Sequence, residues 1–121
     1  MSNLIVFDLA NPGTPKESKA LPERLVEGDP SYRTWEQDIV DGGRIRSGIW
    51  EATPGATRSI KGETWEYCTI LSGVMELIED GREPRRFTAG DTFVMRPGFT
   101  GTWRTIETVR KLWVIVSPEG V

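Results

Sequence analysis

The residues with the clearest chemical potential lie in one short segment, GETWEYCTILSG, which runs from Gly62 to Gly73. It carries a carboxylate, Glu66, and a thiol, Cys68, two positions apart. Side chains two apart on a β-strand point to the same face, so a strand here would place both groups in one interior. A buried carboxylate could serve as a general acid or base. The alternative is a structural carboxylate that accepts hydrogen bonds from neighbouring polar groups.

The Cys68 thiol could act as a nucleophile. A nucleophilic cysteine requires an activating base or a positive charge nearby. The chain contains no histidine, and Lys61 is the nearest candidate activator. Glu66 on the same face would raise the pKa of the thiol rather than lower it. We therefore expect Cys68 to be a small, inert core residue.

Turn signals and short apolar runs predict the elements that position these groups. Leu4–Leu9 is rich in β-formers and predicts a first strand, and residues 11–31 carry four prolines and predict an arm or long loop. Over the whole chain, roughly eight to ten short strands occur at the spacing typical of sandwiches and barrels. The sequence thus predicts one all-β domain, with an N-terminal strand and arm over 1–30 and a barrel over 31–121.

Composition narrows the function. The 121 residues suit one domain, and the net charge of −3 with a pI near 5.0 argues against a nucleic-acid partner. No apolar window approaches the roughly 20 residues of a membrane-spanning helix, and the start of the chain lacks a signal-peptide pattern. A single cysteine excludes an intrachain disulfide. We expect a cytoplasmic protein with no membrane partner.

The last predicted strand, Val109–Val116, is apolar on both faces. Trp113 and Ile115 lie on one face, and Leu112 and Val114 lie on the other. A strand of a single antiparallel barrel should instead have one solvent-exposed, polar face. Either the N-terminal arm or a second subunit must therefore cover the outside. We favour a homodimer.

Three blocks occur in order: WEATPG (50–55), EYCTILSG (66–73) and AGDTFVMRPGFTGTW (89–103), followed by VRKLWVI. Together they resemble the cupin superfamily, and more narrowly the small cupins of the (S)-ureidoglycine aminohydrolase type. The resemblance covers about residues 50–116. It implies a cupin jelly-roll (RmlC-like) β-barrel with a small-molecule site inside.

In metal-binding cupins, the resemblance implies two histidines and a glutamate in a first motif and a further histidine in a second. Glu66 and Gly73 keep the spacing of the first motif. The histidine positions fall on Ile60 and Gly62, or with a longer spacer on Ser59 and Lys61, and the second-motif histidine position is Gly101. A catalytic metal usually needs three protein ligands, so we expect no metal and no other cofactor. An atypical site that combines Glu66 with Cys68 or Glu63 is the alternative.

The space left at Gly101 predicts a binding pocket. Trp103 lies on the same inward face as Gly101 and could line that space, and Trp50 could contribute. The alternative is that both are ordinary aromatic residues of the core. Arg96 stands at a proline position of the second motif, where it could pair with Glu66 or an anionic ligand, or be a surface arginine in a turn. Thr105 stands at the asparagine position.

Two functions follow from these residues. The first is a small-molecule-binding cupin with a degenerate metal site that holds a small polar metabolite among Glu66, Cys68, Trp103, Arg96, Trp50 and Thr105. The second is an enzyme of the hydrolase or isomerase type that uses Glu66 as catalytic acid or base, or an atypical metal.

Overall fold

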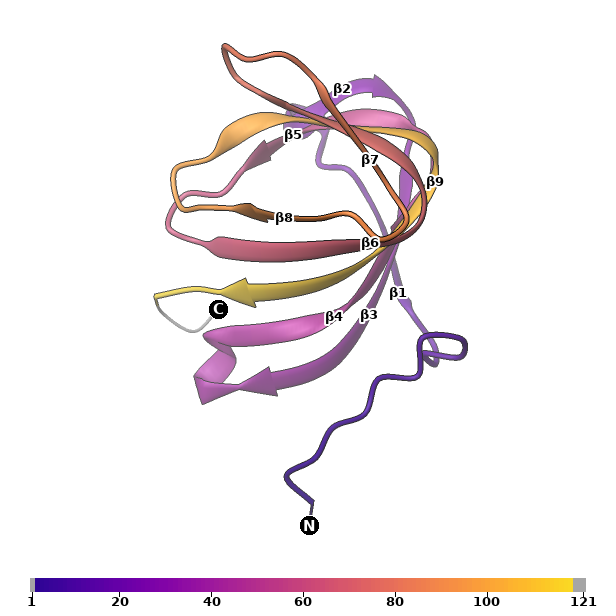
Figure 1. Ribbon diagram of the computed structural model, residues 1–121, viewed down its shortest axis with the longest axis vertical. Helices are drawn as coiled ribbons and strands as arrows, with labels where there is room; N and C mark the ends of the chain where they lie inside the picture. Colours follow the sequence, from indigo (N-terminus) through magenta and orange to yellow (C-terminus); the bar gives the residue numbers. More distant parts are fainter. Residues whose placement is uncertain (1, 119–121) are drawn as a thin grey trace.

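The computed structural model describes residues 2–118, and strands dominate it. Nine strands follow one another, with only two short 3-10 turns, at Pro22–Arg24 and Asp41–Gly43, among the described residues. Their bounds are β1 Lys16–Lys19, β2 Leu25–Gly28, β3 Ser31–Val40, β4 Ile45–Ala52, β5 Gly55–Ile60, β6 Trp65–Glu79, β7 Arg85–Thr88, β8 Thr92–Met95 and β9 Thr100–Val116. The sheet curls on itself into an open barrel (Figure 1), which confirms the all-β, cupin jelly-roll prediction.

Two long strands, β6 and β9, organise the barrel. They pair antiparallel along most of their length, and β9 also pairs with β4 through its C-terminal half and with β5 through its N-terminal half. In the same way β6 pairs with β8 and then with β7. Each long strand therefore belongs to both walls of the barrel, and each must bend between them.

The bend in β6 depends on Gly73. Its φ of 88° lies in the region that favours glycine, and a Cβ added there would lie 2.1 Å from the carbonyl oxygen of Thr108 on β9. The β6–β9 register shifts on both sides of this residue. Such bulges turn a strand sharply and strengthen its twist. The glycine that ends the ILSG block is thus the corner of the barrel.

The alternation of buried and exposed residues sorts the side chains of β6. Glu66, Cys68 and Ile70 are buried and point inward, as the two-residue period predicts. Around them, an apolar core holds Met75, Leu77, Met95, Trp103 and Val109. This core closes one end of the barrel interior beneath the polar group at Glu66.

The N-terminal segment differs from the prediction. Residues 4–9 form no strand and run away from the barrel (Figure 1), and Leu4 and Val6 are 73% and 76% exposed, so the expected first strand is wrong. Further along, the arm touches the outer face of β3. Trp35 Nε1 donates to the carbonyl oxygen of Gly13 at 2.8 Å, and Gln37 Nε2 donates to that of Pro12 at 3.3 Å.

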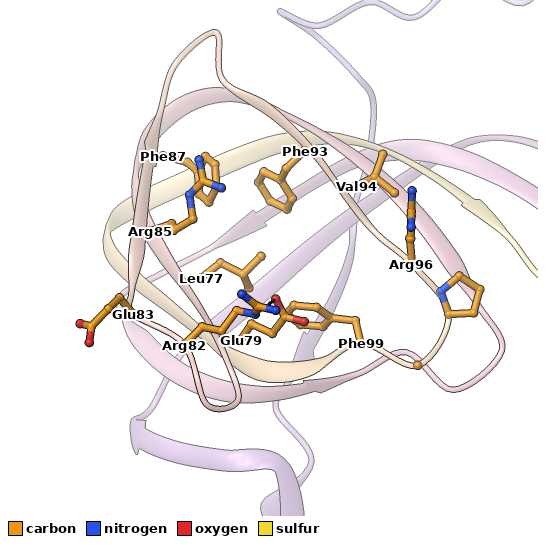
Figure 2. Close-up of a pocket in the computed structure, with 12 residues that line it drawn as sticks. Leu77, Glu79, Arg82, Glu83, Arg85, Phe87, Phe93, Val94, Arg96 and Phe99 are labelled. Atoms are coloured by element: carbon orange, nitrogen blue, oxygen red, sulfur yellow. Dashed lines mark ion pairs between the residues drawn. The ribbon is translucent and has the colours of Figure 1, made fainter.

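A cavity of about 490 Å³ opens near β7 and β8 (Figure 2), and we call it the phenylalanine cavity. Its floor is formed by Leu77, Phe87, Phe93 and Phe99, and Arg82, Arg85 and Arg96 lie around it. A larger cavity lies on the side of the interior that contains Glu66.

Candidate functional site

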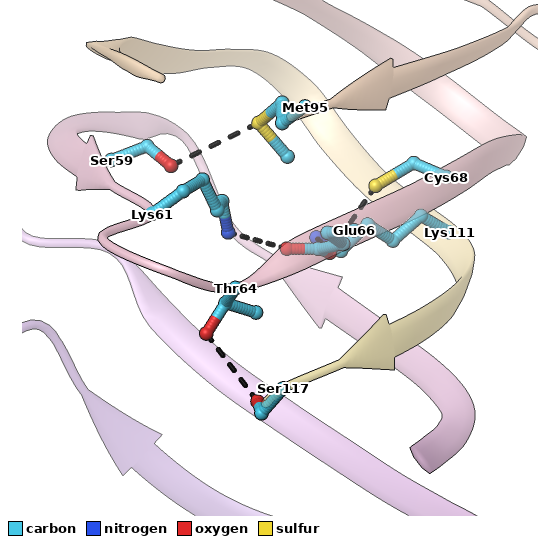
Figure 3. A network of polar contacts seen from close by, with 8 residues as sticks. All are labelled: Ser59, Lys61, Thr64, Glu66, Cys68, Met95, Lys111 and Ser117. Carbon is cyan, nitrogen blue, oxygen red and sulfur yellow. Dashed lines mark hydrogen bonds and ion pairs between the residues drawn. The ribbon is translucent and has the colours of Figure 1, made fainter. Parts of the chain in front are cut away.

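Glu66 is the centre of a buried ionic group. Its side chain is about 4% exposed, and its two oxygens accept from different ammonium groups: Oε1 from Lys61 Nζ at 2.5 Å and Oε2 from Lys111 Nζ at 2.7 Å. The Cys68 thiol also donates to Oε2, at 3.2 Å. Figure 3 shows the four side chains converging inside the barrel. We call Lys61, Glu66 and Lys111 the charged triad.

The three members of the triad come from elements that the β6–β9 pairing brings together. Glu66 lies near the start of β6, and Lys111 lies on the neighbouring C-terminal half of β9, where Ile70 is its partner in register. Lys61 belongs to the short turn between β5 and β6, whose Thr64 N–H donates to the Lys61 carbonyl at 2.9 Å. Burial of an ion pair is tolerated only where its polar groups are satisfied, and here both carboxylate oxygens are.

The contacts within the triad shift the pKa values of Glu66 and Lys111. Burial alone would raise the pKa of Glu66, but the charges of Lys111 and Lys61 outweigh it and lower that pKa from 4.5 to about 2. Burial would likewise lower the pKa of Lys111, but the Glu66 carboxylate beside it raises that pKa above its ordinary value. At neutral pH the Glu66 carboxylate is therefore ionised and the Lys111 ammonium group is protonated.

The thiol beside the triad is inert. Cys68 is fully buried, and burial, the largest cause, together with the neighbouring Glu66 carboxylate raises its pKa from 9.0 to about 12, although Lys111 acts in the opposite direction. A thiol with this pKa carries almost no thiolate at neutral pH, and the thiolate is the nucleophile.

Two indoles enclose the second ammonium group. Lys111 Nζ lies 4.6 Å from the ring centroids of both Trp50 and Trp103, which meet edge to face at 5.4 Å. Cation–π contacts of this kind stabilise a desolvated ammonium by roughly 2 kcal/mol. Trp103 Nε1 in turn donates to Thr105 Oγ1 at 3.1 Å. The aromatic side chains and the triad are thus one packed unit.

This unit lines the larger of the two cavities, about 790 Å³ in volume, which we call the triad cavity. Ligand pockets usually measure 300–1,000 Å³. Its walls come from strands on both sides of the barrel and include Thr34, Glu36, Arg46, Thr57, Arg58, Ser59, Met95 and Trp113 besides the triad, Trp50 and Trp103. The exposed strand β1 contributes Lys16 and Ser18 at one edge.

The structure brings most of the predicted site residues together, and separates one of them. Glu66, Trp50 and Trp103 line the triad cavity, whereas Cys68 lies beneath it against Glu66. Thr105 is buried and accepts the Trp103 N–H. Arg96 lies instead in the phenylalanine cavity (Figure 2), because β8 ends at Met95 and the chain turns outward there.

Sequence reasoning missed Lys111 and gave Lys61 too small a part. Lys111 is the single charged residue within the apolar run KLWVIV, and its inward parity with Trp113 was a usable signal. Among the two alignments of the histidine positions, the longer spacer fits, because Ser59 and Lys61 line the cavity while Ile60 is 46% exposed.

A metal does not fit the residues present. No group of three or more metal-binding side chains of the His, Cys, Asp or Glu type occurs among residues 2–118. The one carboxylate at a family ligand position, Glu66, has both oxygens engaged by ammonium groups, and a cation placed there would be repelled by both. An ammonium nitrogen that stays protonated also offers no lone pair.

The fold is that of a cupin, and comparison with known families agrees. Residues 40–113, more than half of the chain, match the EutQ-like cupin domain. The chain therefore belongs to the EutQ-like cupin family. No curated protein matches it, and the described part contains no helix long and apolar enough to cross a membrane.

Solved structures share the fold. A protein of unknown function of the DUF861 family from Pseudomonas syringae pv. tomato matches with a TM-score of 0.75 and 22% identity, over 85% of this chain and 43% of that one. The EutQ protein of Clostridium difficile matches with 0.63 and 16%, over 73% and 64%. Ectoine synthase from P. lautus matches with 0.66 and 16%, over 74% and 66%. The chain thus spans less than two thirds of the length of each.

Proposed function

We propose that this chain is a small-molecule-binding cupin domain that works without a bound metal and holds a small polar metabolite in the triad cavity. One observation carries the proposal: the two ammonium groups of Lys61 and Lys111 occupy both oxygens of Glu66, on the wall of a cavity of about 790 Å³. A fixed polar group beside aromatic walls is the usual design of a ligand site.

The enzyme alternative is less well supported by the same geometry. A general acid or base works best with a pKa near the operating pH, but the pKa of Glu66 is lowered to about 2 and its oxygens are already engaged. Cys68, with its pKa near 12, is no better suited to nucleophilic attack. A hydrolase or isomerase would therefore need the chemistry of another group, and Lys61 is the half-buried candidate.

Three finer statements belong to this proposal. Within the cupins, the blocks at 50–55, 66–73 and 89–103 favour a relationship to the (S)-ureidoglycine aminohydrolase type. The single cysteine favours a cytoplasmic location. The partly exposed apolar residues Leu112 and Val114, on the outer face of β9, favour a homodimer.

A ligand screen by thermal shift tests the proposal. Ligands that bind only the folded state raise the midpoint of unfolding in proportion to RT ln(1 + [L]/Kd). We expect at least one class of small polar metabolite to stabilise the protein, with the response weakened in a Trp103→Ala variant and kept in Phe87→Ala, whose side chain lines the phenylalanine cavity and not the triad cavity. A broad panel in which no compound stabilises the wild-type protein would refute a binding role.

A further inference from the structure

We infer that the metabolite held in the triad cavity is a small carboxylate, whose anionic group lies on the ammonium groups of Lys61 and Lys111 and whose planar or apolar body lies against Trp50 and Trp103. This inference rests on the proposed function and names the chemical class of its ligand.

The charged triad carries a surplus of positive charge. Glu66 supplies one negative charge and its two partners supply two positive charges, so the group carries a surplus of one. Charges that lie away from bulk water require a partner. A monoanion next to the two ammonium groups would complete the neutralisation, whereas a neutral ligand would leave the surplus in place.

The Lys61 ammonium group has hydrogen-bond donors that its described contacts do not use. An ammonium group has three N–H donors. Among the described hydrogen bonds, Lys61 Nζ donates to Glu66 Oε1 alone, and its side chain is 16% exposed toward the cavity. Lys111 Nζ donates to Glu66 Oε2 and otherwise faces two indole rings. Lys61 thus has the donors that an added carboxylate would accept.

The wall of the cavity is also positively charged. Its lining contains five cationic side chains, Lys16, Arg46, Arg58, Lys61 and Lys111, against two carboxylates, Glu36 and Glu66. Among the described residues Arg46 is paired with Glu36 and Arg58 with Asp80, which leaves the charge of Lys16 and the surplus of the triad. The whole chain carries a net charge of −3. Positive charge is therefore concentrated in this cavity on a protein that is otherwise acidic, which raises the local concentration of anions and repels cations.

The geometry favours a carboxylate over a phosphate. A monoanion matches the surplus of one charge, whereas the second charge of a phosphate dianion would lie close to Glu66 and be repelled by it. The edge-to-face pair of Trp50 and Trp103 offers an aromatic wall beside the ammonium groups. It suits a ligand with an unsaturated or apolar part next to its carboxylate.

Matched ligand pairs test this assignment by isothermal titration calorimetry at low ionic strength. Benzoate, phenylacetate and indole-3-carboxylate are compared with their carboxamides, which keep the shape and lose the charge, and with inorganic phosphate. We expect the carboxylates to bind more tightly than the amides and than phosphate. Lys61→Gln should weaken carboxylate binding at least about tenfold, the value of one hydrogen bond to a charged group.

Two further variants keep the result interpretable. Arg96→Gln in the phenylalanine cavity is the control and should leave the affinity unchanged. If Lys61→Gln does not fold, Lys16→Gln replaces it, because Lys16 is exposed at the edge of the cavity and lies outside the triad. It should weaken carboxylate binding at low salt and less so at high salt, where exposed charges are screened.

The outcomes separate this inference from the proposed function. Equal binding of amides and carboxylates, or preferred binding of phosphate, would overturn the carboxylate assignment and leave a ligand-binding cavity. Carboxylate binding that Arg96→Gln abolishes and Lys61→Gln does not would move the site to the other cavity and overturn it too. Failure of these probes together with every compound of the thermal-shift panel would refute both proposals.

Discussion

Replacing Glu66 by glutamine tests the charged triad most directly. The substitution keeps the size of the side chain but removes the negative charge, and leaves the ammonium groups of Lys61 and Lys111 facing one another in the interior. The folded-state pKa of about 2, against the ordinary 4.5, gives the size of the effect. Since tenfold in acidity is about 1.4 kcal/mol, the ionised carboxylate stabilises the fold by about 3 kcal/mol. That agrees with the roughly 3–5 kcal/mol found when one partner of a buried ion pair is removed.

Urea unfolding followed by tryptophan fluorescence measures this loss at pH 7. Glu63→Gln is the matched control, because Glu63 is exposed in the turn next to β6 and should change the free energy of unfolding by less than about 0.5 kcal/mol. Adding Lys111→Met to Glu66→Gln removes one of the two facing ammonium groups, and we expect it to recover about 1 kcal/mol or more.

The stabilisation by Glu66 depends on pH, and its sign follows from the pKa shift. Because folding lowers the pKa of Glu66, its stabilising effect is complete above about pH 5 and is lost as the pH falls from the unfolded value of 4.5 toward 2. The difference between wild type and Glu66→Gln should therefore shrink toward zero near pH 2. Asp80, whose hydrogen bond from Arg58 lowers its pKa to about 2, titrates in the same range in both proteins and cancels in the difference.

Two results for the Glu66→Gln variant would refute this prediction. If Glu66→Gln is as stable as wild type at pH 7, the triad contributes no net stability and the charges assigned to it are wrong. A difference that stays constant from pH 7 to pH 2 would show a packing effect of the substitution rather than a lost charge.

Four further predictions follow from the same structure. Cys68 should resist iodoacetamide at pH 8 in the native protein and react fully in urea, as measured by mass spectrometry, since burial raises its pKa to about 12; rapid native labelling would contradict its burial. Gly48→Ala should cost about 2 kcal/mol, because the added Cβ would lie 2.2 Å from the carbonyl oxygen of Trp35, and an unchanged urea midpoint would contradict that close approach. Protein purified without a polyhistidine tag should hold less than about 0.1 metal ions per chain by mass spectrometry. A stoichiometric metal would overturn the conclusion that the residues present do not fit a metal ion. Light scattering after size exclusion should give a dimer that Leu112→Lys and Val114→Lys weaken, and a clean monomer would remove the homodimer proposal.

The sequence was sufficient for the fold because its signals are local. Turn residues and two-residue alternation mark the strands, and they also place Glu66 and Cys68 on one inward face. Local signals mislead at Leu4–Leu9, where β-forming residues meet no neighbouring strand and stay outside the sheet. Strand propensity describes a residue that fits a paired sheet, and it does not supply the partner.

The alternation along β9 indicates that Lys111 faces inward, but it does not show that Lys111 meets Glu66, because the two are distant in sequence. Lys111 is 45 residues from Glu66, and only the β6–β9 register brings them within 2.7 Å. A register slip of one residue would turn Lys111 to the outer face. The position of Arg96 could not be predicted from the sequence either, because it depends on where β8 ends. Periodicity gives the face of a residue but not its neighbour on the next strand.

The ammonium group of Lys61 on the Glu66 carboxylate also has a consequence for the protein in its cell. A positive charge that is covalently part of the chain cannot dissociate, be exchanged for a competing ion or be removed by a chelator. Divalent metals compete for a vacant site in an order set largely by their intrinsic affinities. Under the proposed function, we therefore expect ligand binding in the triad cavity not to vary with the supply of iron, zinc or manganese.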